Sequence, residues 1–409
     1  MSKRAMKNGI GGFGLIEIMV GLVIGLIAIL VIGQVTATFE GQKRASTGGG
    51  DAQTNGMVAL STLTHEMTMA GTGLVTPGLG TAGGTLMCPL GITINGSSNI
   101  LAPVRIIDGG TASDSITVVR SDAEFGQLAT NVRKSDFTAS PPSVTVDAWT
   151  DSRITSGAIN SLTYNDTALF PSPVVLLIPN PKSGDNINYA CTLLQVSGID
   201  RSTLSSETGP PSSPAWHLRF DASYPYNGAA PARKPNDGDI LINMGMSVPY
   251  NGATQEGNLT INRAGFVYRQ YGVQCGKLAA SDPSQMTATP ACTNTSPLVD
   301  EIVYLKAQYG VAAAAGSQDV VAWHNAQGAW ASPLSAANIA LIKAVRIAVV
   351  ARSPQYEKSS VSPASITLWD TTGFAGADAA PVFAVPDQQY RYKVFTTVVP
   401  IKTVIWGKL

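Results

Sequence analysis

The sequence has few charged residues and very few histidines. Charged residues make up 13% of the 409 positions, and 27 lysines and arginines balance 27 aspartates and glutamates. A nucleic-acid-binding protein normally carries a basic excess, so we expect no nucleic-acid partner. The three histidines, His65, His217 and His324, stand far apart in the chain, which argues against a histidine-ligated metal site.

The chain also lacks the short motifs that mark common catalytic sites. No GxSxG occurs, "THEMT" at 64–68 lacks the second histidine of HExxH, and "GLGTAGGTL" at 78–86 lacks the GK[ST] ending of a phosphate-binding loop. Asp237 and Asp239 do not have EF-hand spacing, so a solvated turn is a simpler interpretation than a calcium site. We therefore expect no catalytic residue, no metal site and no cofactor.

Cysteine is scarce, but its pattern is informative. Cys88, Cys191, Cys275 and Cys292 form an even set without CxxC spacing, which favours disulfides in an exported protein. Cys275 and Cys292 flank a short polar stretch, so we predict a local bridge between them, worth about 3 kcal/mol in the loop-entropy model. Cys88 then pairs with Cys191. The two other pairings, and four unpaired core cysteines, remain alternatives.

Glycine and proline are plentiful, with 41 and 25 residues, and short apolar runs lie between them. This pattern predicts a domain rich in strands and loops. The length permits one large domain with insertions or two subdomains. We expect a short helix over 335–342 and strands over 115–121, 173–179, 189–198, 216–220, 239–244, 259–273, 301–311, 342–352, 365–369 and 390–399.

An apolar segment lies near the N-terminus, and no charged residue occurs from Ile18 to Phe39. As a helix, residues 13–32 alone would span about 30 Å, the thickness of the hydrocarbon core of a bilayer. The first twelve residues carry three cations and no acid. By the positive-inside rule this predicts a cytoplasmic N-terminus and an exported remainder.

Glu17 separates three interpretations of this segment: a signal anchor, a cleaved secretory signal peptide with Val35 and Ala37 before the cut, and a prepilin-type signal. A carboxylate inside an apolar helix costs about 2.5–3.5 kcal/mol on insertion scales, so it indicates a function. Generic anchors lack such a residue. If the Glu17 side chain only extended to the membrane surface, the occurrence of Gly12 and Phe13 just before it would have no explanation.

The stretch "GFGLIEIMVGLVIG" (12–25) resembles the class III signal of type IV pilins, although Gly14 replaces the Ser or Thr of many pilins. The resemblance implies that a prepilin peptidase cuts between Gly12 and Phe13 and that Phe13 is then N-methylated. Glu17 matches the characteristic glutamate of the family. Its carboxylate can neutralise the Phe13 amine of a neighbouring subunit, which favours one axial register between packed helices and makes Glu17 an assembly residue.

A second helical pattern follows the apolar segment. Gly48, Gly49 and Gly50 cost about 3 kcal/mol of helix propensity, so an unbroken long helix is in doubt and Asp51 is a possible N-cap. Gly71 and Gly73 are expected to stop the helix. The apolar stripe expected to pack on a sheet consists of Met57, Leu60, Leu63, Met67 and Ala70.

Later stretches narrow the resemblance to the PilW family of minor pilins. "DEIVYLKAQYGV" (300–311), "IKAVRIAVVARSP" (342–354) and "YRYKVFTTVVPIKTVIW" (390–406) are similar to the C-terminal half of that family. The asparagine-glycine helix with its alanine-glycine end, within 51–73, is similar to its N-terminal half. Residues 75–300 are recognised by composition only.

These resemblances imply an α+β, type IV pilin-like fold. We expect a leader peptide over 1–12, a transmembrane and filament-core helix over 13–39, its amphipathic continuation over 40–74, and a β-rich head over 75–409, enlarged by insertions. The implied function is that of a non-enzymatic minor pilin in type IV pilus assembly or initiation, with roles in adhesion or twitching motility.

The same resemblance implies the partners and the location. The partners are prepilin peptidase, which is also the N-methyltransferase, other minor and major pilins, the inner membrane and the pilus assembly platform. The expected location is the inner membrane with the head in the periplasm, and then the surface pilus. Two alternatives are a type II secretion pseudopilin and, from another class, a membrane-anchored periplasmic hydrolase or ligand-binding protein.

Overall fold

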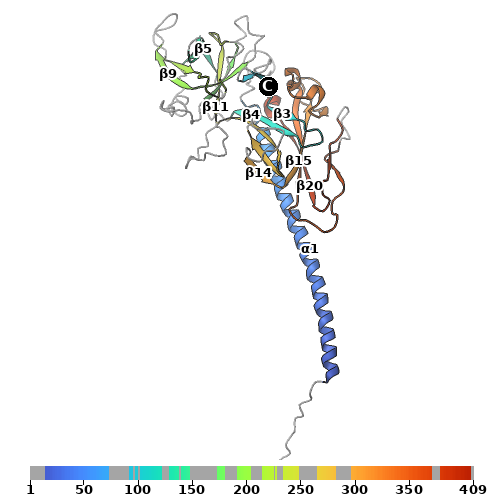
Figure 1. The fold of residues 1–409 in the computed structure, drawn as a ribbon. Helices are drawn as coiled ribbons and strands as arrows, with labels where there is room; N and C mark the ends of the chain where they lie inside the picture. The colour runs from blue at the N-terminus through green and yellow to red at the C-terminus, as the bar shows by residue number, and fades with distance from the viewer. Residues whose placement is uncertain are drawn as a thin grey trace, which may run out of the picture.

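The protein consists of one long N-terminal helix that projects from a head with two lobes (Figure 1). The helix and the largely antiparallel sheets make an α+β fold, as predicted from the sequence. The computed structural model describes residues 14–72, 92–94, 97–99, 102–121, 129–137, 140–147, 173–179, 191–203, 214–224, 226–227, 234–247, 265–281, 296–370 and 378–406.

Helix α1 (Leu15–Thr68) is unbroken over 54 residues. The expected interruption at the three glycines is wrong, and Asp51 lies inside the helix instead of capping a new one. Gly48 is buried against the head, and such tertiary packing outweighs the low helix propensity of glycine. Gly71 follows the helix with a φ of +80°, which confirms this glycine as part of the stop.

Four antiparallel strands of the head form the sheet on which α1 lies. Their order is β16-β15-β17-β20, and α1 covers one face. A hairpin made of β18 (Ser365–Thr367) and β19 (Val382–Ala384) packs on the opposite face. The four strands are β15 (Ile302–Val311), β16 (Ala322–His324), β17 (Ile342–Arg352) and β20 (Tyr392–Pro400), so the predicted strands over 301–311, 342–352 and 390–399 are confirmed.

Fourteen described strands form the other, larger sheet. Most pairs are antiparallel, whereas β1 with β8 and β11 with β12 are parallel. Strand β12 pairs with β4, β11 and β13, so it connects a branch made of β3, β4, β13 and β14 to β11 in the middle of the main strand order β2-β1-β8-β7-β11-β5-β6-β10-β9. The strands are β1 (Ile92–Ile94), β2 (Ser97–Asn99), β3 (Val104–Ile107), β4 (Ser115–Ser121), β5 (Ala129–Asp136), β6 (Ser143–Asp147), β7 (Pro173–Ile178), β8 (Cys191–Gln195), β9 (Gly198–Thr203), β10 (Pro214–Arg219), β11 (Ile240–Ser247), β12 (Gly265–Gln274), β13 (Lys277–Ser281) and β14 (Ser296–Asp300).

Three short helices complete the described chain: η3 (Gly328–Trp330), α3 (Ala336–Leu341) and α4 (Lys402–Trp406). Helix α3 confirms the short helix predicted over 335–342. The side chain of Ser335 accepts a hydrogen bond from the Asn338 N–H at 3.2 Å, which caps this helix.

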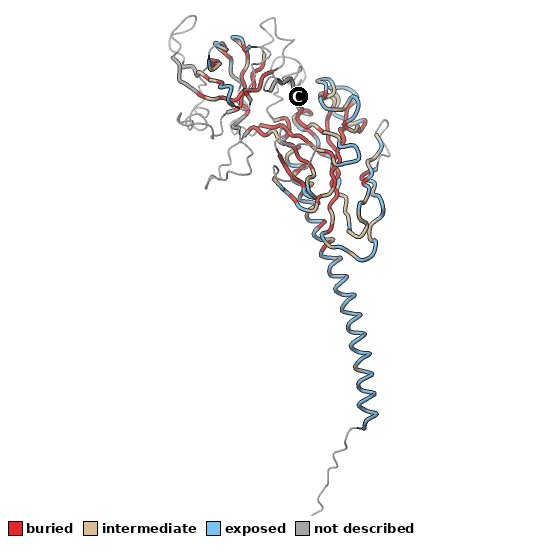
Figure 2. Tube along the Cα trace, in the orientation of Figure 1, coloured by how far each residue is buried: buried red, intermediate tan, exposed pale blue. Residues whose placement is uncertain are grey.

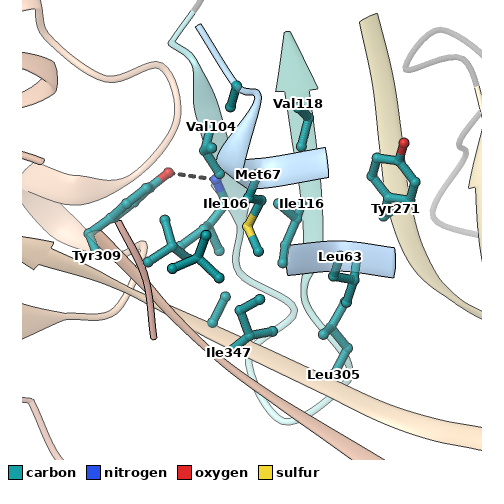
Figure 3. Close-up of a cluster of buried hydrophobic side chains, with 14 of the residues drawn as sticks. Leu63, Met67, Val104, Ile106, Ile116, Val118, Tyr271, Leu305, Tyr309 and Ile347 are labelled. Carbon is teal, nitrogen blue, oxygen red and sulfur yellow. Dashed lines mark hydrogen bonds between the residues drawn. The ribbon is translucent and has the colours of Figure 1, made fainter. Parts of the chain in front are cut away.

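The main hydrophobic core lies where the second half of α1 meets both sheets (Figure 3). Leu63 and Met67 are fully buried there, between strands β3 and β4 on one side and β15 and β17 on the other. The Ile106 N–H donates to the hydroxyl of buried Tyr309 at 2.5 Å. The predicted stripe is only partly right, because Met57 is 57% exposed.

Candidate functional site

Glu17 lies in the first turn of α1, where the apolar run begins. The Gly14 N–H donates to Glu17 Oε2 at 3.3 Å, and the carboxylate is exposed. A negative charge at this end of a helix also interacts favourably with the helix dipole. Gly12 and Phe13 lie outside the described residues, so the cleavage, the methylation and the pairing with Glu17 stay predictions.

The first half of α1 is an apolar surface that the rest of the described chain leaves uncovered (Figure 2). Its large apolar side chains, from Leu15 to Phe39, are 47% to 77% exposed. The helix is long and apolar enough to cross a membrane. Such a surface is unfavourable in water, so it needs lipid or other apolar helices around it. Glu40, Lys43 and Arg44 follow directly and mark the end of the run.

Small residues form the face of α1 that packs closely on the head, and this face is called the seat of the helix. Gly48, Ala52, Gly56 and Ala59 are buried and follow one another at helical spacing on one face. A Cβ atom on Gly48 would lie 2.3 Å from Ser353 Oγ, and one on Gly56 would lie 2.1 Å from the Phe395 ring. These contacts explain why glycine occurs inside the helix.

The predicted stripe leaves out this seat because it consists mainly of large apolar residues. The spacing of the small residues over 48–59 was the signal that could have found it. The buried stripe contains Ala59, whereas the predicted stripe contained Met57 and Leu60. Met57 is exposed and Leu60 is only partly buried. Close packing of a helix on a sheet selects for side-chain size as well as for hydrophobicity.

We expect Gly56→Ala to lower the free energy of unfolding by about 1–3 kcal/mol, because the added methyl group overlaps the Phe395 ring. Gly49→Ala is the matched control. No atom lies within 4 Å of the position that its Cβ would take, so it should stabilise the helix by about 1 kcal/mol. Denaturant unfolding of the detergent-purified protein measures both changes. Changes of the same sign and size would contradict the proposed seat.

The C-terminal end of α1 is fixed to strand β4 and to helix α4. Arg120 Nε of β4 lies 3.0 Å from Glu66 Oε2, and these side chains are only 10% and 14% exposed. Just beyond the helix, the hydroxyl of Thr403 donates to the Ala70 carbonyl at 2.6 Å. The helix therefore ends in a polar junction, and movement of the head on α1 would have to break a largely buried ion pair.

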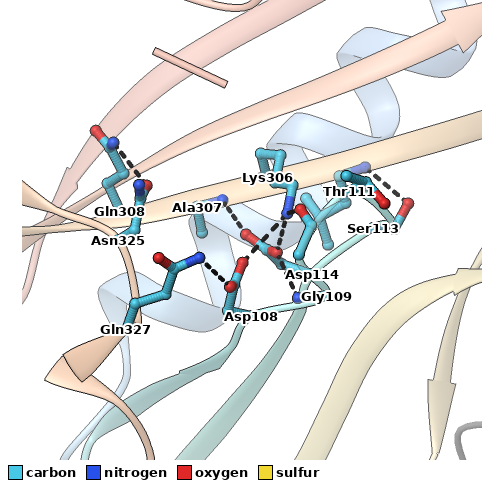
Figure 4. A network of polar contacts seen from close by, with 12 residues as sticks. Asp108, Gly109, Thr111, Ser113, Asp114, Lys306, Ala307, Gln308, Asn325 and Gln327 are labelled. Atoms are coloured by element: carbon cyan, nitrogen blue, oxygen red, sulfur yellow. Dashed lines mark hydrogen bonds and ion pairs between the residues drawn. The ribbon is translucent and has the colours of Figure 1, made fainter. Parts of the chain in front are cut away.

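A buried charged cluster joins the turn between β3 and β4 to strand β15 (Figure 4). Lys306 Nζ lies 2.6 Å from Asp114 Oδ1 and 3.3 Å from Asp108 Oδ1. It also donates to the Gly110 carbonyl at 2.7 Å. The Lys306 and Asp114 side chains are 5% and 3% exposed, so each charge depends on the other for compensation.

The same turn closes the edge of β15. The Asp114 N–H donates to the Leu305 carbonyl at 2.8 Å, and the Ala307 N–H donates to Asp114 Oδ2 at 3.0 Å. The Leu305 N–H donates to Ser113 Oγ at 3.3 Å. Side-chain oxygens here take the place of carbonyls from a neighbouring strand, so these backbone groups are satisfied without a further strand.

Burial raises the pKa of Asp114 from 3.8 to about 6, although hydrogen bonds from Lys306 and Gly109 oppose the shift. Between about pH 4 and pH 6 the folded protein therefore holds a proton that the unfolded chain has lost. The stabilising contribution of this group is complete below pH 4 and is lost as the pH rises through 6. From the size of the shift, the change is about 3 kcal/mol.

We expect the difference in unfolding free energy between the wild type and Asp114→Asn to fall by about 3 kcal/mol between pH 4 and pH 7.5. Asp221→Asn is the control. Hydrogen bonds from Ser223 lower the pKa of exposed Asp221 from its usual 3.8, so its contribution is lost only below about pH 4 and its difference from the wild type should stay nearly constant between pH 4 and pH 7.5. Denaturant titrations at both pH values give these differences. A pH-independent effect of Asp114→Asn would contradict the shift.

Two of the three histidines contact another side chain in the described structure. His217 Nδ1 lies 3.2 Å from Thr145 Oγ1, and His324 stacks on Trp330 with ring centroids 5.2 Å apart. His65 is exposed in the last turn of α1. Within the described ranges, no group of three histidine, cysteine, aspartate or glutamate residues is placed to hold a metal ion.

The "NDGD" stretch forms a turn, as the simpler interpretation had it. The Ser135 N–H donates to Asp237 Oδ1 at 3.0 Å, and the Asn236 N–H donates to Asp239 Oδ2 at 2.8 Å. Asp237 is exposed, but Asp239 is buried, so the expectation of a fully solvated turn is wrong for Asp239. Its carboxylate closes the turn from inside the head.

Two of the four cysteines lie in the described part of the chain. Cys191 and Cys275 lie in the described chain and are not free thiols. Cys88 and Cys292, their predicted partners, lie outside the described residues, as does the glycine-rich stretch 78–86. The pairings Cys88–Cys191 and Cys275–Cys292 therefore stay predictions.

Comparison with known proteins bears on the sheet that seats α1. No curated protein and no solved structure matches the chain significantly. The family model of PilW, type IV pilus-assembly protein W, matches residues 274–403. This segment runs from the end of β12 through β20, and it contains the stretches at 300–311 and 342–354 that carried the resemblance. Over the four-stranded sheet on which α1 is seated, the resemblance to the PilW family is therefore confirmed.

Proposed function

We propose that this protein is a PilW-like minor pilin that takes part in the assembly or initiation of a type IV pilus. The family match supports involvement in type IV pilus assembly. The observation that carries the finer proposal is the division of α1. Its first half is apolar and uncovered, and its second half is seated on the sheet that holds the family match.

In this proposal α1 has two successive environments. Its apolar half lies in the inner membrane before assembly and packs among the helices of other pilins afterwards. Prepilin peptidase removes residues 1–12, and the Phe13 amine then meets Glu17 of a neighbouring subunit. Either charge alone would be costly in apolar surroundings, so the pair favours one axial register.

The head then lies in the periplasm and later on the surface pilus, where it supports adhesion or twitching motility. The orientation rests on Lys3, Arg4 and Lys7, which precede the helix without an acid. The proposed partners are the peptidase, other minor and major pilins, and the assembly platform. The role is structural, and no catalysis by this chain is part of the proposal.

The mature N-terminus tests the proposal directly. Mass spectrometry of the chain recovered from sheared pili should find N-methylated Phe13 as the first residue. An intact Met1, or a new N-terminus at Thr38, would contradict processing as a pilin. Gene deletion adds a second test: loss of surface pili supports the proposal, whereas normal pili with blocked export of secreted enzymes would favour a type II secretion pseudopilin.

A further inference from the structure

The two edges of the four-stranded sheet differ. On one side, β16 and the turn of residues 108–114 satisfy the outer edge of β15. On the other side, β20 pairs with β17 and with no further strand in the described part of the chain. An edge strand presents a row of backbone N–H and C=O groups that another strand can pair with.

Strand β20 lacks the usual protection of an edge. All nine of its residues pair with β17 without a β-bulge. Residues 394–399 read "VFTTVV", which has high β-propensity and contains no charge, glycine or proline. Lys393, near the start of the strand, is held by Gln53 Oε1 of α1 at 3.0 Å. Pro400 stands only at the end, so nothing within 394–399 opposes strand pairing.

The second half of β20 is the open part. Tyr392 and Val394 pack against the cluster under the β18–β19 hairpin, whereas Thr396 is exposed and Val398 is 50% exposed. On the other face Phe395 packs on Gly56 of α1. An added strand would therefore run beside Thr396 and Val398, next to the helix that the proposed function places in the filament.

We propose that the free edge of β20 binds an extended segment of another type IV pilus subunit, which adds to the sheet as a further strand. This inference rests on the proposed function. Backbone hydrogen bonds would supply the affinity, and the uncharged side chains of Thr396 and Val398 would select an uncharged, β-prone segment.

The direction of β20 argues against antiparallel pairing of two copies of this chain. Gln53 and Gly56 of α1 contact Lys393 and Phe395 of β20, in that order along both elements. Ala70, after α1, likewise contacts Thr403, after β20. Helix α1 and strand β20 therefore run in the same direction. Antiparallel pairing of two β20 strands would point their α1 helices in opposite directions. Both helices could not then enter one membrane from the same side, so a different subunit is the better occupant.

The test places lysines on the open edge. Thr396→Lys with Val398→Lys should reduce the amount of this chain in sheared pili about ten-fold, because two charged side chains would stand on the sheet face directly beside the side chains of the added strand and oppose its pairing. The control, Val382→Lys with Ala384→Lys, places the same charges on exposed positions of β19, where Val382 is 52% exposed. It should assemble as the wild type does. Unchanged assembly of the β20 variant would overturn the inference.

Crosslinking identifies the occupant. A photo-crosslinking amino acid at position 398 of the full chain, activated on intact pili, should capture an extended segment of another pilus subunit, whereas one at position 382 should not. Capture of a second copy of this chain, or of lipid alone, would overturn the inference. If the wild-type chain is absent from pili, the proposed function itself fails. If the chain is present and the β20 variant assembles normally, only the strand addition is wrong.

Discussion

Replacement of Glu17 by alanine should leave the protein in the membrane fraction but reduce its amount in assembled pili about a hundred-fold or more. The variant removes the carboxylate that pairs with the Phe13 amine of a neighbour. Removing one partner of a buried charge pair costs about 3–5 kcal/mol, since the other charge stays uncompensated. Insertion itself should improve, because a carboxylate no longer enters the apolar segment.

Glu40→Ala is the matched control for Glu17→Ala. Glu40 is an exposed acid on the same helix, but it lies after the apolar run. Its removal should change neither insertion nor incorporation. Immunoblots of the membrane fraction and of sheared pili measure both quantities. Normal incorporation of the Glu17 variant would contradict the proposed pairing of Glu17 with the Phe13 amine of a neighbour. The family match over 274–403 would not be affected.

Replacement of Lys306 by methionine should lower the free energy of unfolding by about 3–5 kcal/mol at neutral pH. The variant keeps most of the side-chain volume but leaves Asp114 buried without its closest counter-charge, which lies 2.6 Å away. The turn of residues 108–114 would then hold the edge of β15 less firmly. The loss should become smaller below about pH 6, because a neutral carboxyl group needs no counter-charge.

Lys277→Met provides the control for Lys306→Met. Lys277 Nζ lies 2.8 Å from Asp300 Oδ1, but these side chains are 46% and 67% exposed. Solvent screens such a pair, so its loss should cost at most about 1 kcal/mol. Denaturant unfolding at pH 7.5 and pH 5 compares the two variants. Equal costs would mean that Lys306 does not compensate a buried charge.

The sequence predicted mainly strands that contain short runs of β-branched and other apolar residues. Residues 115–121 and 342–352 coincide with β4 and β17, because strands buried on both sides are rich in β-branched and other apolar residues, even though each of these two strands also contains a buried arginine. Strand β5, with the sequence "ATNVRKSD", was missed. It alternates polar residues with few apolar ones, and its pairing with β6 and β11 is what makes it a strand.

The candidate site divides in a similar way. Glu17 stood out because a lone carboxylate in an apolar run is visible in the chain itself. Lys306 did not stand out, because its partners Asp108 and Asp114 are almost two hundred positions away and only the fold brings them together. Contacts between distant segments leave no local pattern that spacing could have revealed.

By itself, the sequence determined the apolar run, its single carboxylate, the α+β class and the resemblance over the last strands, since each depends on local composition or period. Only the tertiary structure decided that α1 continues through three glycines, which of its faces is seated, and which sheet edge stays open. Those outcomes depend on close packing and on hydrogen bonds between distant segments, and such energies outweigh the local propensity of a glycine or the size of a single apolar residue.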